Sequence, residues 1–246
     1  MSVEWTDDAI VLGARPFGET QALVEIFARE HGRAAAIVHG GASKRMKPTL
    51  QGGNLVRATW KARTSDQLGF FAPMELIEPH AARVLDDPAA LAGLSSATEL
   101  IRAGAAERQA YPGLYDALVV LLEALSGAEL WPAVYTRFEL GLLAELGYGL
   151  DLGACALTGE TGDLAFVSPR SGRAASREAG APYADKLLRL PPFLTDGAAP
   201  VESGDVADAF ALAGYFLERR IFDRQGHGMP DSRRRLIEAL GHRGRL

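Results

Sequence analysis

The clearest structural signal in the chain is an alternation over eight residues, Val56-Arg57-Ala58-Thr59-Trp60-Lys61-Ala62-Arg63. Even-numbered positions are apolar, and odd-numbered positions are cationic or carry a hydroxyl group. Because successive side chains of a β-strand point to opposite faces, the alternation predicts a strand whose even positions face a core and whose odd positions face solvent.

This strand lies at the end of a strongly cationic window. From Arg29 to Arg63 the sequence holds eight Lys or Arg residues and one acid, Glu30, so the window carries +7 in a chain whose formal net charge is −5. A cationic band on an acidic protein indicates a surface for a polyanion, most commonly nucleic acid. The alternative is a solvated strand face whose charges only prevent edge-to-edge pairing. We predict a nucleic-acid-binding surface formed by seven of the cations: Arg33, Lys44, Arg45, Lys47, Arg57, Lys61 and Arg63.

Short β-type runs separated by glycine-containing turns fill the first part of the chain. Five such runs lie over residues 9–12, 22–27, 34–38, 56–63 and 67–77. Five short strands in this length fit a small Greek-key barrel such as an OB-fold, and an SH3-like barrel fits them nearly as well. Residues 1–79 are therefore predicted to form a barrel domain.

The apolar period becomes helical after about residue 80. Asp87 followed by Pro88 predicts a helix start, with a capping carboxylate and a proline at the first helical position. Residues 151–181, rich in Gly, Ser, Thr and Arg, break the helical period and predict a compact insertion. The predicted fold class is α+β: a five-stranded OB-fold barrel, then an all-helical domain over residues 80–246 that contains this insertion.

Composition and end sequences exclude several classes of protein. No apolar stretch approaches the roughly 20 residues that span a bilayer, and the acidic start, residues 1–8, lacks a signal-peptide pattern. A single cysteine, Cys155, excludes an intramolecular disulfide and an all-cysteine metal site. We expect a cytoplasmic protein associated with the nucleoid.

No catalytic constellation is present in the sequence. The stretch from Gly40 to Lys44 fails the spacing of a phosphate-binding loop, and the five histidines are dispersed without metal-ligand spacing. Cys155 is expected to be a small buried thiol rather than a nucleophile. We predict that the protein is not an enzyme and needs no cofactor.

Several motifs together resemble the RecO family of DNA repair and recombination mediators. The resemblance runs in order from residue 4 to about residue 224. It rests on Ala9-Ile10-Val11-Leu12 with Gly18-Glu19-Thr20, on residues 138–148 leading into Cys155, and on Val167-Ser168-Pro169-Arg170-Ser171-Gly172-Arg173 preceded by Leu164-Ala165-Phe166.

The resemblance implies an N-terminal OB domain and a helical domain with an inserted zinc-ribbon-like element. It also implies binding of single- and double-stranded DNA, annealing of complementary strands, and action with RecR and RecF. Members of the family help to load recombinase onto DNA covered by single-strand-binding protein, without nucleotide hydrolysis.

The chain departs from the family's zinc-binding pattern of two Cys-x-x-Cys pairs. Cys155 and Thr158 stand at the first pair, and Ser176 and Ala179 at about the second. One thiolate of four cannot close a structural zinc site. We therefore predict a metal-free ribbon packed by four apolar side chains: Leu157, Leu164, Phe166 and Val167.

Two further contacts follow as expectations. The resemblance implies a pocket for the acidic C-terminal tail of single-strand-binding protein, ringed by Arg219, Arg220 and Arg224; these arginines fit a solvated face or a disordered basic tail equally well. Phe17 is a candidate for stacking on bases, whereas the alternation buries Trp60. The rival functions are an RNA-binding OB-fold protein and a purely protein-binding adaptor.

Overall fold

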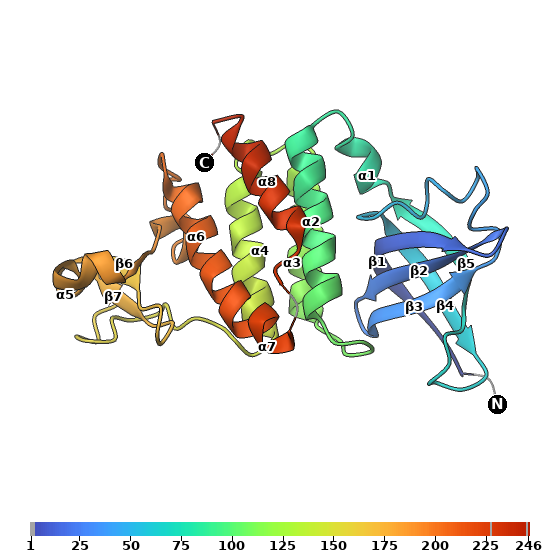
Figure 1. Ribbon diagram of the computed structural model, residues 1–246, viewed down its shortest axis with the longest axis horizontal. Helices are drawn as coiled ribbons and strands as arrows, with labels where there is room; N and C mark the ends of the chain where they lie inside the picture. Colours follow the sequence, from blue (N-terminus) through green and yellow to red (C-terminus); the bar gives the residue numbers. More distant parts are fainter. Residues whose placement is uncertain (1–2, 227, 245) are drawn as a thin grey trace. The chain divides into compact units, whose positions relative to one another are not determined.

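The computed structural model describes residues 3–226, 228–244 and 246 of the chain (Figure 1). The chain forms two compact units, and each is described by itself. The first comprises residues 1–127 and 232–236, and the second residues 128–231 and 237–246. The predicted boundary at residue 79 falls within the first unit and stays a prediction.

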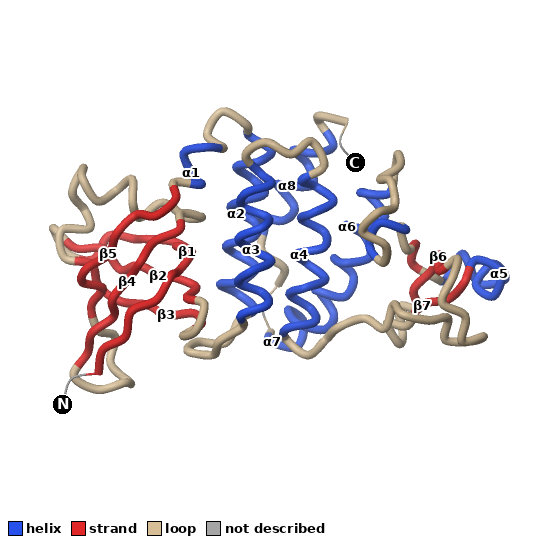
Figure 2. The backbone as a smooth tube through the Cα atoms, turned by 180° about the vertical axis from the view of Figure 1, so that it is seen from behind, coloured by secondary structure: helices blue, strands red, loops and turns tan. Residues whose placement is uncertain are grey.

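Five strands of the first unit close into a barrel in the order β1-β2-β3-β5-β4 (Figure 2). They are β1 (Val3–Phe17), β2 (Gln21–Ala28), β3 (Gly32–Val38), β4 (Leu55–Ala62) and β5 (Phe70–Glu78). β3 and β5 pair in parallel, and the other pairs are antiparallel. A parallel pair cannot arise in a simple meander, so the OB-fold prediction is confirmed over the SH3-like alternative.

The barrel interior is filled by alternate positions of the strands. On β2 and β3 these are small or branched side chains, such as Val24, Ile26 and Ala36, all without exposed surface. The predicted alternation on β4 holds for its apolar half but not for Thr59, which is buried. Thr59 lies opposite Thr6 of β1, and the two hydroxyls share a hydrogen bond of 2.8 Å.

Three helices complete the first unit before residue 128: α1 (His80–Arg83), α2 (Pro88–Gly104) and α3 (Pro112–Leu125). The predicted cap of α2 is present, because the Asp87 carboxylate accepts hydrogen bonds from the backbone N–H groups of Ala89 and Ala90. This satisfies two of the N–H groups that a helix start leaves without partners.

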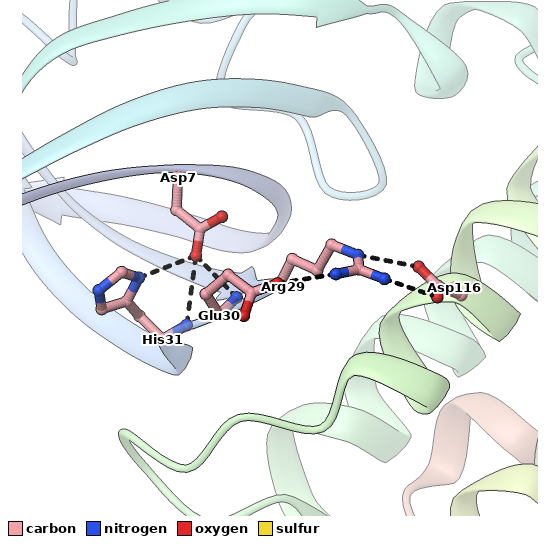
Figure 3. Close-up of polar contacts among 5 residues, drawn as sticks. All are labelled: Asp7, Arg29, Glu30, His31 and Asp116. Carbon is pink, nitrogen blue, oxygen red and sulfur yellow. Dashed lines mark hydrogen bonds and ion pairs between the residues drawn. The ribbon is translucent and has the colours of Figure 1, made fainter.

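The turn between β2 and β3 is held from both sides by carboxylates (Figure 3). Asp7 of β1 accepts the backbone N–H groups of Glu30 and His31 and lies 2.9 Å from His31 Nδ1. Arg29 makes a two-point contact of 3.1 and 3.0 Å with Asp116 of α3. The barrel and α3 are thereby joined by ionic contacts inside one unit.

The second unit combines helices with a small ribbon. Its helical elements include α4 (Trp131–Glu145), α6 (Asp205–Leu217), a π-helical turn (Glu218–Phe222) and α7 (Asp223–Gln225); α8 (Asp231–Gly241) follows near the C-terminus. The ribbon sheet has the order β7-β6-β8, from β6 (Leu164–Val167), β7 (Ala174–Ser176) and β8 (Leu188–Arg189). A short helix, α5 (Arg177–Gly180), and 3-10 turns at Ala181–Lys186 and Pro192–Leu194 complete the unit.

The predicted ribbon core is correct in part. Phe166 and Val167 are buried and Leu164 is partly buried, but Leu157 is 66% exposed, so its assignment to the core was wrong. Leu157 lies on the loop that precedes β6 rather than on a strand, so strand alternation does not turn it inward. β8 lies beyond the predicted insertion, so the sheet needs residues after 181. Among the residues described, no helix is long and apolar enough to cross a membrane.

Candidate nucleic-acid interface

The outward cations of β4 are paired with acids of β1. The register places Asp8 opposite Arg57 and Glu4 opposite Lys61. Arg57 donates two hydrogen bonds to the Asp8 carboxylate, of 2.8 and 3.1 Å. Lys61 Nζ lies 3.1 Å from Glu4 Oε1. The hydrogen bond that Arg57 donates to the Asp8 carboxylate raises the pKa of the Arg57 guanidinium. This face of the barrel is therefore ionic but locally compensated.

Arg33 of β3 is likewise engaged by protein groups. Its guanidinium lies 3.4 Å from carboxylate oxygens of both Glu25 and Glu107, and its Nε donates to the Ala105 carbonyl oxygen at 3.1 Å. Its side chain is only 18% exposed. Arg33 thus anchors the segment after α2 to the barrel.

The other predicted cations remain uncompensated. Lys44, Arg45 and Lys47 are exposed on the loop between β3 and β4, and Arg63 is exposed just after β4. Within residues 3–226, 228–244 and 246, these four side chains form no ion pair with a carboxylate. The seven predicted cations therefore divide into three that are paired and four that can meet an external anion.

The cationic loop is ordered by its own backbone and by a buried amide. Lys47 N–H bonds to the Ser43 carbonyl oxygen at 3.1 Å, and Leu50 is buried against the barrel core. Asn54, 1% exposed, donates from Nδ2 to the Pro48 carbonyl oxygen at 2.7 Å and accepts the Ala81 N–H at 3.0 Å. This one side chain fixes the loop to the start of α1.

One cation of this region, Arg15, was not predicted from the sequence. Arg15 of β1 and Lys47 line one pocket of about 260 Å³, together with Gln21 and Leu50. Arg15 is exposed and lies outside the window that begins at Arg29. A count of charges along the sequence could not find it, because the β1–β2 hairpin brings it to the loop.

Trp60 belongs to the core, as the alternation predicts. It is 4% exposed, and its Nε1 donates to the Leu68 carbonyl oxygen at 3.1 Å. Arg108 lies over its ring at 5.7 Å. Trp60 is therefore not a surface for bases.

The three arginines predicted for a partner pocket have different surroundings. Arg220 donates to the carbonyl oxygens of Tyr148 and Ser171 at 2.9 and 3.0 Å, and burial lowers its pKa. Arg219 and Arg224 are exposed, with their guanidinium groups 4.7 and 5.5 Å from the rings of Tyr215 and Tyr148 respectively. Arg220 is thus committed to structure, and the other two stay accessible.

The residues at the zinc positions surround a single thiol. Hydrogen bonding lowers the pKa of the Cys155 thiol to about 6. The Thr158 hydroxyl has the largest effect on this pKa, and the backbone of Ser176 the next largest. Ala179, at the fourth position, contributes only a methyl group that packs against this cluster. One thiol, two hydroxyls and a methyl do not fit the ligand requirements of zinc, and the described residues contain no other metal-ligand cluster.

The closed five-stranded barrel, with its order β1-β2-β3-β5-β4 and parallel β3–β5 pair, defines an OB-fold protein. OB-folds are barrels that bind oligonucleotides or oligosaccharides. Two family profiles match nearly the whole chain. "Recombination protein O N terminal" matches residues 1–80, and "Recombination protein O C terminal" matches residues 85–227. The chain belongs to the recombination protein O family, a family of DNA repair and recombination.

Full-length relatives agree with this assignment. The DNA repair protein RecO of Phenylobacterium zucineum is 49% identical over 244 residues, covering 99% of this chain and 100% of the relative. That of Rhodospirillum centenum is 50% identical over 238 residues, covering 96% and 94%. That of Caulobacter vibrioides is 46% identical over 246 residues, covering 100% and 98%.

Proposed function

We propose that this chain acts in recombinational repair as a non-catalytic DNA-binding mediator, and that its barrel contacts the sugar-phosphate backbone. The observation that carries the proposal is the ordered loop with Lys44, Arg45 and Lys47, which lack carboxylate partners among the described residues. Lys47 also lines one pocket with Arg15. The paired cations Arg33, Arg57 and Lys61 are secondary in this proposal, because their charge is already balanced.

The physical basis of this binding is release of counterions. Each phosphate that a lysine or arginine neutralises frees condensed cations, so the affinity falls as salt rises. Phosphate contacts carry no base information, so sequence preference should be weak. The same surface would lower the repulsion between two complementary strands, which gives a route to strand annealing.

The proposed mediator role includes partners. In this proposal RecR and RecF act with the protein on the same DNA in the cytoplasm, and the acidic tail of single-strand-binding protein docks on the second unit. Arg219 with Tyr215 and Arg224 with Tyr148 offer cations beside aromatic rings, which suits an acidic tail with a terminal aromatic residue. Loading of recombinase would follow from displacing single-strand-binding protein.

The test is a salt series of binding to a fluorescent single-stranded oligonucleotide. The triple variant Lys44→Ala/Arg45→Ala/Lys47→Ala should flatten the slope of log affinity against log salt by about 2, since each lost phosphate contact removes about 0.7. The matched control is Arg57→Ala/Lys61→Ala, which removes compensated cations and should change the slope much less.

Three outcomes would contradict the proposal. An unchanged slope in the triple variant would place the DNA site elsewhere in the chain. A clear preference for RNA over DNA of the same sequence would favour an RNA-binding barrel. A lack of binding by the wild type at low salt would indicate a protein-binding adaptor.

A further inference from the structure

One outer face of the barrel carries a row of side chains that the charge pattern does not reveal. The strand registers place Arg15 of β1 opposite Leu23 of β2, Leu23 opposite Ile37 of β3, and Ile37 opposite Phe70 of β5. Directly opposed residues share a face of the sheet. Val24, which follows Leu23 on β2, is fully buried in the core. Because successive side chains of a strand point to opposite faces, Leu23 and the row from Arg15 to Phe70 face outward.

A second row lies beside the first. Phe17 stands opposite Gln21, and Gln21 Nε2 lies 2.9 Å from His39 Nδ1. The His39 ring stacks on Phe70 with centroids 4.8 Å apart and planes 20° apart. Phe17 and Phe70 are each 41% exposed, so both rings are accessible to a ligand. Two aromatic surfaces, Phe17 and the His39–Phe70 pair, thus bracket this face.

The face combines apolar and aromatic side chains with Arg15, Gln21 and His39, and it lies next to further cations. The acids around the two rows are mostly paired. Beyond Phe70 the register continues to Lys61 and then to Glu4, which form an ion pair at 3.1 Å. Glu25 of β2 is neutralised by Arg33 and Arg102 at 3.4 and 3.2 Å, and Glu19 lies exposed in the turn between Phe17 and Gln21. Gln21 and Arg15 also line the pocket that Lys47 borders. Aromatic rings beside a cationic groove are the arrangement that binds unpaired nucleic acid, with bases on the rings and phosphates on the cations.

We infer that Phe17 and the His39–Phe70 pair form a stacking surface for the bases of a single strand. The inference rests on the proposed DNA binding and specifies the form of nucleic acid that this site takes. In a duplex the bases are stacked on one another, so only an unpaired strand can present their faces to Phe17 and Phe70. Stacking tolerates any base, so the site selects strandedness rather than sequence.

The test compares a thymidine oligonucleotide with an abasic oligonucleotide of equal length, which keeps the phosphates but lacks the bases. The wild type should bind the thymidine strand at least about fivefold more tightly, as expected when one or two bases stack. Phe17→Ala/Phe70→Ala should abolish this preference while leaving the affinity for the abasic strand unchanged. Phe17→Tyr/Phe70→Tyr should retain the preference.

A matched control is available on β5. Leu76 and Ile77 are 40% and 41% exposed, like Phe17 and Phe70, but lie outside the two rows. Leu76→Ala/Ile77→Ala should leave the preference for the thymidine strand intact. Equal melting temperatures of both double alanine variants would show that the loss is not due to unfolding.

The possible failures are distinguishable. Equal wild-type affinity for both oligonucleotides would overturn the stacking surface and leave phosphate binding intact. Binding of neither oligonucleotide would overturn the proposed function and the inference together. The third failure is a Phe17→Ala/Phe70→Ala variant that keeps the preference for the thymidine strand but no longer binds an Asp-rich peptide ending in Phe. This result would show that the face docks a peptide, and it would overturn the inference.

Discussion

Arg57 and Asp8 form a two-point ion pair across the β1–β4 ladder, although they are separated by 49 residues in sequence. Lys61 and Glu4 form a second, single-contact ion pair further along the same two strands. The outer face of β4 is therefore held close to neutrality by β1, and its cations are available to an external anion only when the acids are displaced or removed.

Removing these two acids should strengthen DNA binding. In Glu4→Gln/Asp8→Asn, Arg57 and Lys61 lose their carboxylate partners, and the slope of log affinity against log salt should steepen by up to about 1.4 for a single strand. The measurement is the same salt series with a fluorescent oligonucleotide. Glu145→Gln, which removes an exposed acid of α4 outside the barrel, serves as the control. An unchanged slope in the double variant would show that DNA does not approach β4.

Asn54 should be a large contributor to the stability of the first unit. Asn54→Ala leaves the Pro48 carbonyl oxygen and the Ala81 N–H without this partner in a buried place, which should cost about 1–3 kcal/mol. Urea unfolding measures the change. Gln51→Ala, at an exposed position of the same loop, should shift the midpoint little. Equal midpoints for the two variants would contradict the anchoring role of Asn54.

His80 should make stability depend on pH. Its two ring nitrogens are buried without hydrogen-bond partners among the described groups, and burial, aided by Arg83, lowers its pKa from 6.5. The unfolded chain takes up a proton as the pH falls through 6.5, while the folded chain resists it. The contribution is therefore complete above pH 6.5 and lost as the pH falls below it.

Urea midpoints of wild type and His80→Phe, measured between about pH 5 and pH 8, test this linkage. The variant should show a weaker decline on the acid side. The exposed His39 provides the comparison, through His39→Gln. A decline that is identical in wild type and His80→Phe would rule out His80 as its source.

Arg220 and Arg219 should differ in their effect on stability. Arg220→Ala removes hydrogen bonds to three carbonyl oxygens, of Tyr148, Gly149 and Ser171, and a contact with the Phe216 ring at 4.5 Å. Arg219→Ala removes only a ring contact among its described interactions. A hydrogen bond from a charged group contributes about 1.5–3 kcal/mol, so Arg220→Ala should be the more destabilising by at least about 1.5 kcal/mol. Equal urea midpoints would contradict this.

The ribbon should bind zinc only after its ligands are restored. Purified wild type is expected to contain far less than one zinc ion per chain, since Cys155 is the single thiolate at the four positions. Thr158→Cys/Ser176→Cys/Ala179→Cys should raise the content toward one per chain, by elemental analysis. Near-stoichiometric zinc in the wild type would overturn the prediction of a metal-free ribbon.

Patterns that repeat within one strand were predictable, whereas partners brought together by register were not. Alternation placed Val56, Ala58 and Trp60 correctly in the barrel core. The same alternation gave Arg57 no partner, because Asp8 reaches it only through the β1–β4 pairing. Strand periodicity contains no information on which distant strand lies alongside.

The candidate site shows the same limit. Lys44, Arg45 and Lys47 were found because they are close together in sequence, and they remain uncompensated among the described residues. Arg15 was missed because only the hairpin and the loop fold bring it to Lys47. Phe17 was noticed singly, but the face it shares with Phe70 depends on three strand registers.

The barrel wall is unevenly joined. In the part of the chain that the structure describes, β3 and β5 share the single register pair Ile37–Phe70. The Ile37 N–H group also donates to the Gly69 carbonyl oxygen at 3.2 Å. Every other neighbouring pair of strands in the barrel has a longer ladder. His39 and Phe70 stack across this joint. A single strand of nucleic acid bound to His39 and Phe70 would connect β3 and β5 where their pairing is shortest. Binding of the ligand would therefore also make the barrel more rigid.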